Sequence, residues 1–257
     1  MDILRKELNA VYAAQCLNEE FLDRSGVEEC KGRVESMVSV NNACSVITDA
    51  ARDCCYLYAG GLGSLLGLTE DMNMYRELDS SDEDLIYDRI HPEDLVEKRM
   101  LEYEFFRYVD PLPAAEKVRY RATCRIRIRD RRESYVMVDN SVQILRPSPA
   151  GRIWLILCCY DLSSGQEPQG GIEPRIVNNS TGDVLTLSLA DRRDRILTER
   201  EKDVLRLIRD GRLSKQIADE LGISIHTVNR HRQNILEKLS VGNSVEAIVA
   251  ATSMKLF

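Results

Sequence analysis

Three side chains with hydrogen-bonding tips lie close together near the C-terminal end of the 257-residue sequence: Asn229, Arg230 and Gln233. At about 100° per residue they project from one side of a predicted helix, whereas apolar residues such as Val228 and Ile235 project from the other. In the major groove of DNA, arginine can hydrogen-bond to guanine, and asparagine or glutamine to adenine. An ordinary solvent-exposed helix is the alternative, although such a helix more often carries Glu–Lys pairs.

Two shorter helices are predicted directly before this one. Thr198 and Glu201 have the spacing of a capping box at the start of the first helix, and Gly211 ends it. Ser214 is the expected N-cap of the second helix, and Gly222 permits the tight turn into the third. Two short helices joined by a glycine-containing turn are typical of a helix-turn-helix, although the arrangement also occurs in ordinary helical cores.

The stretch 197–241 resembles the four-helix DNA-binding domain of LuxR-type bacterial transcription regulators. The matching residues are Leu197, Thr198, Arg200, Glu201, Gly211, Lys215, Ile217, Ala218, Leu221, Ile223, Ser224, Thr227, Val228, His231, Lys238 and Leu239. The resemblance implies that Asn229, Arg230 and Gln233 contact DNA bases and would determine sequence preference.

The same resemblance implies phosphate contacts by Lys215, Thr227 and Lys238, which would determine affinity and register. A fourth helix is expected near the C-terminal end and matches the family less closely. The family often has an arginine shortly before Glu-Ala, whereas this chain reads SVEA at 244–247, which weakens the transfer of DNA contacts to this helix.

In the family the fourth helix forms the dimer surface, which would here involve Val245, Ile248 and Val249. The alternative is a helix that only completes the core of the domain.

The region before the DNA-binding domain mixes strand and helix patterns. Strands are expected at 44–49, 54–59 and within 118–130, 134–145 and 152–162. Apolar residues in 1–40 have helical spacing, and 60–117 is expected to be mainly helix and loop, with a longer helix from Pro92 that ends at the prolines after residue 110. This order resembles a PAS domain, and the segments 54–68, 90–95 and 159–164 carry the resemblance.

PAS domains are sensor and dimerisation modules that hold a small ligand, flavin, haem or nothing between helices and sheet. No cofactor is evident from the residues. His91 matches the His-Pro motif of the family and is expected to cap a helix rather than to bind haem. A haem- or flavin-binding redox sensor and a ligand-free interaction module stay open as alternatives for this domain.

The arginines between residues 119 and 129 alternate with apolar residues, which predicts a half-buried strand with one basic face. An anion-binding surface is one interpretation of this stripe. A solvated face whose arginines pair with nearby acidic groups is favoured, so no site is assigned to it.

The formal net charge of −7 hides an asymmetry, because residues 191–257 carry +3 and the rest of the chain −10. A positively biased C-terminal region suits attraction to phosphates. The eight cysteines include no C-x-x-C spacing and are interpreted as reduced thiols of a cytosolic protein, and no metal site is predicted.

Together these patterns predict an α+β protein: a PAS-like antiparallel sheet with flanking helices, followed by an all-α four-helix helix-turn-helix domain. The expected segments are an N-terminal helical segment (1–40), the PAS-like domain (41–165), a linker with a hairpin (166–195) and the DNA-binding domain (196–257). The expected function is that of a cytoplasmic, sequence-specific DNA-binding transcription regulator that forms a homodimer. A small-molecule ligand and RNA polymerase are further candidate partners, and neither enzyme activity nor a membrane segment is predicted.

Overall fold

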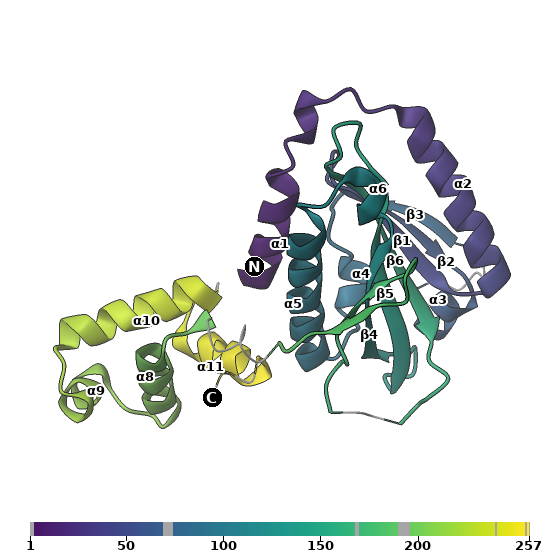
Figure 1. Ribbon diagram of the computed structural model, residues 1–257. Helices are drawn as coiled ribbons and strands as arrows, with labels where there is room; N and C mark the ends of the chain where they lie inside the picture. The colour runs from purple at the N-terminus through teal and green to yellow at the C-terminus, as the bar shows by residue number, and fades with distance from the viewer. Residues whose placement is uncertain are drawn as a thin grey trace. The chain divides into compact units, whose positions relative to one another are not determined.

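The computed structural model describes residues 3–68, 74–167, 170–189, 196–239, 241–254 and 256. The chain divides into two compact units, Leu8–Leu187 and Ser188–Phe257 together with Met1–Glu7. We call the first the sheet unit and the second the helical unit. The sheet unit contains an antiparallel sheet with helices on both faces, whereas the described part of the helical unit consists of helices and their connections (Figure 1).

Within the described residues, one antiparallel sheet has the strand order β3-β2-β1-β6-β5-β4-β7-β8. Its strands are β1 (Cys44–Asp49), β2 (Cys54–Ala59), β3 (Met74–Leu78), β4 (Tyr120–Arg129), β5 (Tyr135–Pro147), β6 (Ile153–Leu162), β7 (Arg175–Asn178) and β8 (Val184–Thr186). β1 and β2 are buried along their whole length, whereas β4 alternates between buried and half-exposed residues. The period-two pattern of β4 therefore reflects a sheet that is covered there on one face.

Two long helices flank the sheet on opposite sides (Figure 1). α2 (Arg24–Asn41) packs on β1 and β2, and α5 (Pro92–Val109) packs on β4. We call the face under α2 the outer face and the face under α5 the inner face. The shorter helices before β4 are α1 (Ile3–Ala13), the 3₁₀ turn η1 (Leu17–Glu19), α3 (Gly61–Leu65), α4 (Asp84–Tyr87) and α6 (Ala114–Lys117).

The outer-face core depends on one apolar stripe of α2. Val27, Cys30, Val34 and Val38 recur at three- and four-residue spacing, which places them on one side of the helix. They are buried in one cluster with side chains of the sheet: Ile47, Cys54, Tyr56, Tyr58, Trp154, Leu155 and Leu157. This packing fixes α2 over half of the outer face.

The start of α5 follows the sequence prediction. Pro92 occupies the first turn, and His91 Nδ1 accepts a hydrogen bond from the backbone nitrogen of Glu93 at 3.3 Å. The expected capping role of His91 is thus confirmed. The ring of His91 also stacks at a tilt on Tyr135, with 5.0 Å between the ring centroids.

Three members of the arginine stripe on β4 pair with acidic groups, as the favoured interpretation expects. Arg125 Nε lies 2.9 Å from an oxygen of Asp139, and Arg129 pairs with Glu133 at 2.8 Å. Arg127 donates to Asp94 from its backbone nitrogen at 2.7 Å and from Nε at 3.0 Å.

The inner face carries a buried polar cluster that the sequence analysis did not identify. Lys98 on α5 has a fully buried side chain, pairs with Glu102 one turn later and donates to the hydroxyl of Tyr87 at 3.1 Å. Tyr87 also donates to Glu102 at 3.3 Å. On the same face, the hydroxyl of Tyr160 on β6 donates to buried Glu83 at 2.5 Å.

The charges of this inner cluster depend on each other. Burial acts to lower the pKa of Lys98, but the acidic groups around it, Glu102 first and then Glu83, together outweigh burial and raise that pKa above its ordinary value. Burial raises the pKa of Glu83 and so favours its neutral form. Lys98 therefore stays charged, and Glu102 is its principal counter-ion.

The predicted fold class is confirmed: an antiparallel sheet with flanking helices precedes an all-helical domain. The expectation that 60–117 is mainly helix and loop is confirmed as well, although this range also contains the short strand β3, which was not expected. β3 is a short strand at the edge of the sheet, where it pairs with β2. Tyr75 on β3 packs on Tyr58 on β2, with 5.2 Å between the ring centroids. Such a strand forms through its pairing with a neighbour rather than through a strong pattern of its own.

The described part of 166–195, expected to be a linker with a hairpin, contains β7 and β8. β7 pairs with β4, so the sheet unit continues to Leu187. Gly182 adopts a φ of 80° in the turn between these two strands, a conformation that glycine adopts without strain.

The described residues contain neither a metal-binding cluster nor a membrane-spanning helix. No group of three or more His, Cys, Asp or Glu side chains there could hold a metal ion. None of the helices described combines the length and the apolar composition needed to cross a bilayer. All eight cysteines are free thiols, and six of them are buried.

Candidate nucleic-acid interface

Four helices form the described core of the helical unit: α8 (Glu199–Arg209), α9 (Ser214–Leu221), α10 (Ile225–Leu239) and α11 (Ser244–Ser253) (Figure 1). α10 packs against each of the other three. The buried apolar side chains of these helices and of the residues next to them are Leu197, Val204, Leu205, Ile217, Ala218, Val228, Ile235, Leu239, Ala247, Ala251, Met254 and Leu256. One side of α10 is thus held in the core, as its apolar spacing predicts.

The capping box predicted at the start of α8 is confirmed. The backbone nitrogen of Glu201 donates to the hydroxyl of Thr198 at 3.3 Å, and the backbone nitrogen of Thr198 donates to Glu201 Oε2 at 2.8 Å. Lys238 on α10 donates to the same carboxylate at 2.6 Å. Although burial acts to raise it, the pKa of Glu201 is lowered by the hydrogen bonds from Lys238 and Thr198.

We expect Glu201→Gln to destabilise the helical unit by about 1 kcal/mol at neutral pH, because the charge-assisted bond to Lys238 is lost. Since the folded-state pKa of Glu201 is lowered, its stabilising contribution is present above the ordinary glutamate pKa and is lost as the pH falls through the folded value. The difference between variant and wild type should therefore shrink as the pH falls below roughly 4.3.

Urea denaturation followed by circular dichroism tests this. The only tryptophan, Trp154, lies on β6, so its fluorescence reports the sheet unit and should not change in the variant. Glu199→Gln is the matched control, because the side chain of Glu199 is 77% exposed in its pair with Lys202. A Glu201→Gln difference that grew toward low pH would contradict the assignment.

Two arginines of the domain have structural contacts that sequence reasoning did not identify. Arg200, part of the Leu-Thr-x-Arg-Glu motif, donates to the carbonyl oxygen of Leu221 at the end of α9, at 2.5 Å. Arg232 donates to the hydroxyls of Ser214 and Ser244, at 3.2 and 3.0 Å. Since Ser214 and Ser244 are the first residues of α9 and α11, Arg232 ties three helices together. The motif match includes Arg200, and helical spacing places Arg232 on the apolar side of α10, but neither signal identifies the partners of these arginines.

The expected N-cap role of Ser214 is wrong. Leu213 precedes the first turn of α9, and its backbone nitrogen donates to Gln216 Oε1 at 2.9 Å. Ser214 lies inside the helix, where its hydroxyl accepts from Arg232. The side chain of Gln216 satisfies the helix terminus instead, so a serine cap is not required.

The turn into α10 has the predicted geometry. Gly222 ends α9 with a φ of 65°, in the left-handed region. Ser224 Oγ then accepts from the backbone nitrogen of Thr227 at 3.0 Å and lies 2.8 Å from its hydroxyl. These contacts start α10 and orient its exposed side.

The three candidate base-contacting residues are all exposed on α10. Among the described residues, the side chains of Asn229 and Arg230 have no hydrogen-bond or ion-pair partner. Their polar groups are therefore available to an external partner. The amide nitrogen of Gln233 donates to Glu237 at 2.9 Å, a bond that a base contact would have to replace.

The candidate phosphate-contacting residues differ in their surroundings. Lys215 is exposed in the first turn of α9, and Thr227 is half-buried beside Ser224 at the start of α10. Lys238 lies eleven residues after Thr227, about 16 Å farther along the helix, and pairs with Glu201. The structure thus brings Lys215 and Thr227 to the beginnings of their helices, whereas Lys238 lies at the opposite end of α10 in a structural contact.

Residues 195–251 match a protein-family model described as bacterial regulatory proteins, luxR family. The transcriptional regulatory protein DesR of Bacillus subtilis is 54% identical over 52 residues, which are 20% of this chain and 26% of DesR. The transcriptional regulatory protein UhpA of Escherichia coli K12 is 45% identical over 62 residues, 24% of this chain and 32% of UhpA. The chain spans less than half the length of these curated relatives.

Solved structures cover more of the chain at lower similarity. A structure of the Vibrio cholerae VqmA dimer has 18% identity and a TM-score of 0.30, over 87% of this chain and 88% of that one. A sensory box histidine kinase/response regulator from Burkholderia thailandensis has 18% identity and a TM-score of 0.32, over 70% of this chain and 96% of that one.

Proposed function

We propose that this chain, in which residues 195–251 form a LuxR-type helix-turn-helix domain, is a sequence-specific DNA-binding transcription regulator. The observation that carries the proposal is the exposed pair Asn229 and Arg230. Both lie on a helix whose opposite side is buried, and neither has an intramolecular partner among the described residues. Unpaired polar side chains on the exposed side of a packed helix can hydrogen-bond to base edges in the major groove.

In this proposal Asn229, Arg230 and Gln233 contact bases from α10. Arg230 suits a bidentate contact to guanine, and the amides of Asn229 and Gln233 suit adenine. Gln233 can contact a base only after the hydrogen bond from its amide to Glu237 breaks.

Lys215 and Thr227 contact phosphates in the same proposal. Their places at the beginnings of α9 and α10 support this, because backbone N–H groups and the helix dipole there also favour anions. Lys238 is the third phosphate contact. The ammonium group of Lys238 already pairs with Glu201 and would have to bind the phosphate at the same time. We therefore expect Lys238 to contribute less to DNA affinity than Lys215.

We further propose that the protein acts as a homodimer through α11. Val245 and Val249, one turn apart on this helix, are 71% and 65% exposed, whereas Ala247 and Ala251 are buried. Two exposed valines on one side of a helix support a self-complementary contact rather than a helix that only completes the core.

The sheet unit is the proposed sensor or dimerisation part, in the PAS-like arrangement expected from the sequence. The inner cluster supports a ligand-sensing role, because Lys98, Tyr87 and Glu102 are buried polar groups that can orient a small molecule on this face of the sheet. Haem is disfavoured as that ligand, since Nδ1 of the domain's only histidine, His91, accepts the helix-capping bond. We also propose that the protein acts in the cytoplasm. We propose contact with RNA polymerase as well, but assign no surface to it.

Selection of genomic fragments on the purified full chain tests the proposed function. The captured fragments should share a motif, arranged as two half-sites if the protein binds as a dimer. Their affinity should also fall steeply as the salt concentration rises, because phosphate contacts release counter-ions. A captured pool without a shared motif would reject sequence-specific binding.

A further inference from the structure

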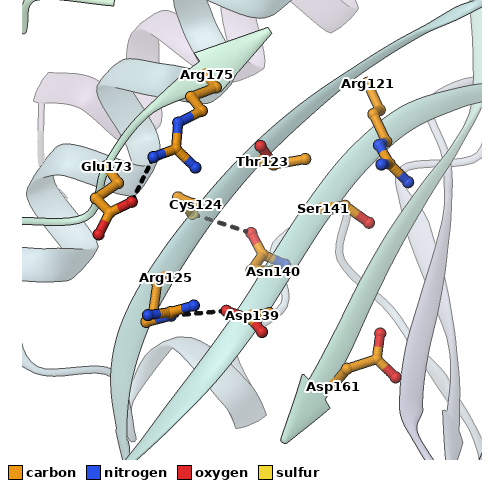
Figure 2. Close-up of a pocket in the computed structure, with 10 residues that line it drawn as sticks. All are labelled: Arg121, Thr123, Cys124, Arg125, Asp139, Asn140, Ser141, Asp161, Glu173 and Arg175. Atoms are coloured by element: carbon orange, nitrogen blue, oxygen red, sulfur yellow. Dashed lines mark hydrogen bonds and ion pairs between the residues drawn. The ribbon is translucent and has the colours of Figure 1, made fainter. Parts of the chain in front are cut away.

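The outer face of the sheet is covered only in part. α2 packs over β1 and β2, whereas the outward-facing side chains of β4, β5 and β7 and the end of β6 stay partly exposed. This uncovered area, which we call the open face, contains a shallow depression of about 310 Å³ (Figure 2). Its charged residues are Arg121, Arg125, Arg175, Asp139, Asp161 and Glu173.

The six charges balance, but they do not all pair. Arg125 pairs with Asp139 at 2.9 Å, and Arg175 pairs with Glu173 at 2.5 Å, as the dashed lines in Figure 2 show. These pairs leave Arg121 and Asp161, which have no ion-pair or hydrogen-bond partner in the part of the chain that the structure describes. Both side chains are exposed.

The strand register keeps these two charges apart. Arg125 on β4 lies opposite Asp139 on β5, and Asp139 lies opposite Asp161 on β6. Arg121 is four residues from Arg125, so the Cα atoms of Arg121 and Asp161 are offset by about 13 Å along the strands and about 10 Å across them. Partial burial, and then the charge of Asp139, raise the pKa of Asp161.

We propose that the open face binds the open face of a second copy of this chain, in a two-fold arrangement that pairs Arg121 of each copy with Asp161 of the other. A two-fold rotation about an axis between the two residues exchanges their positions, so both pairs form together. A second copy has the matching charges at the matching separation by symmetry, whereas an unrelated partner would need them by coincidence. The inference rests on the proposed homodimer and adds a second contact to it.

The size of the open face indicates how strong this contact can be. Four strands about 4.8 Å apart and about six residues long cover roughly 400 Å². A stable interface buries about 800 Å² per partner. The contact is therefore a weak one that is sensitive to salt. Val177 and the 55%-exposed Val184 add apolar area beside Arg121.

Charge reversal in the full chain tests the pairing. Sedimentation velocity at low salt should show that Arg121→Asp and Asp161→Arg each weaken self-association about tenfold or more, because each homodimer then has two like-charge pairs. An equimolar mixture of the two variants should recover the wild-type association, since the mixed dimer again has two opposite-charge pairs. The double variant should recover it as well.

The mixture restores opposite charges only between two copies, whereas the double variant also restores them within one chain. Recovery by the mixture therefore identifies a contact between copies. Arg132→Asp, in the exposed loop after β4, is the matched control and should leave association unchanged. Unchanged Trp154 fluorescence and circular dichroism show that each variant is folded. Recovery by the double variant without recovery by the mixture would overturn the proposal.

Val249→Glu separates this inference from the proposed dimer. If Val249→Glu weakens association and the two charge variants do not, the open face is not a contact and the α11 dimer stands. That result would leave the open face to another occupant, such as a small zwitterion. If the wild type is monomeric at every concentration, both the dimer and the inference are rejected.

Discussion

Replacing Arg230 by alanine is expected to weaken binding to a captured DNA fragment by about 1–3 kcal/mol and to relax the preference at one base pair. We expect this loss because the side chain of Arg230 is exposed and has no hydrogen-bond or ion-pair partner among the described residues. Fluorescence anisotropy with the wild-type fragment, and with each base changed in turn, measures both effects.

Two other arginines provide the controls. Arg209→Ala removes an exposed arginine at the end of α8 and should leave sequence preference unchanged. Arg232→Ala should lower the stability of the helical unit, because Ser214 and Ser244 lose their shared donor. If Arg230→Ala weakened binding equally for all sequences, Arg230 would be a phosphate contact and the base assignment would be wrong.

Replacing Lys98 by methionine is expected to destabilise the sheet unit by about 3–5 kcal/mol. The change leaves Glu102 buried without its cation and close to Glu83, and the desolvation of an unpaired charge is costly. Urea denaturation followed by Trp154 fluorescence measures the loss in the sheet unit alone.

The double variant Lys98→Met/Glu102→Gln should recover much of this stability, because residue 102 then has no charge to be left without its cation. Arg33→Met is the surface control. Arg33 pairs with Glu29 at the same i, i+4 spacing, but its side chain is 73% exposed, so the effect should stay below about 1 kcal/mol. A Lys98→Met variant as stable as Arg33→Met would contradict the importance of the inner cluster.

Local patterns predicted most elements because the signal for each lies within one segment. The alternation of arginine and apolar residues predicted β4, and Thr198 with Glu201 predicted the start of α8. His91 was also assigned correctly, since a capping residue and the following proline are adjacent in sequence.

Contacts between distant segments could not be predicted in this way. Arg127 pairs with Asp94 and Tyr160 with Glu83, across 33 and 77 residues. β3 was missed because an edge strand depends on its partner. The same reason applies to the site: the sequence marked Lys238 through its family position, but only the fold shows that Glu201 holds it.

The central claim is that α10 reads a DNA sequence through Asn229, Arg230 and Gln233. It is tested most directly by the ratio of the dissociation constants for a captured fragment and for a shuffled version of it, measured with the full chain over a range of salt. The account predicts that the captured fragment binds at least about 1,000-fold more tightly and that both affinities fall as salt rises. Equal affinities for the two fragments, or binding that does not respond to salt, would contradict it.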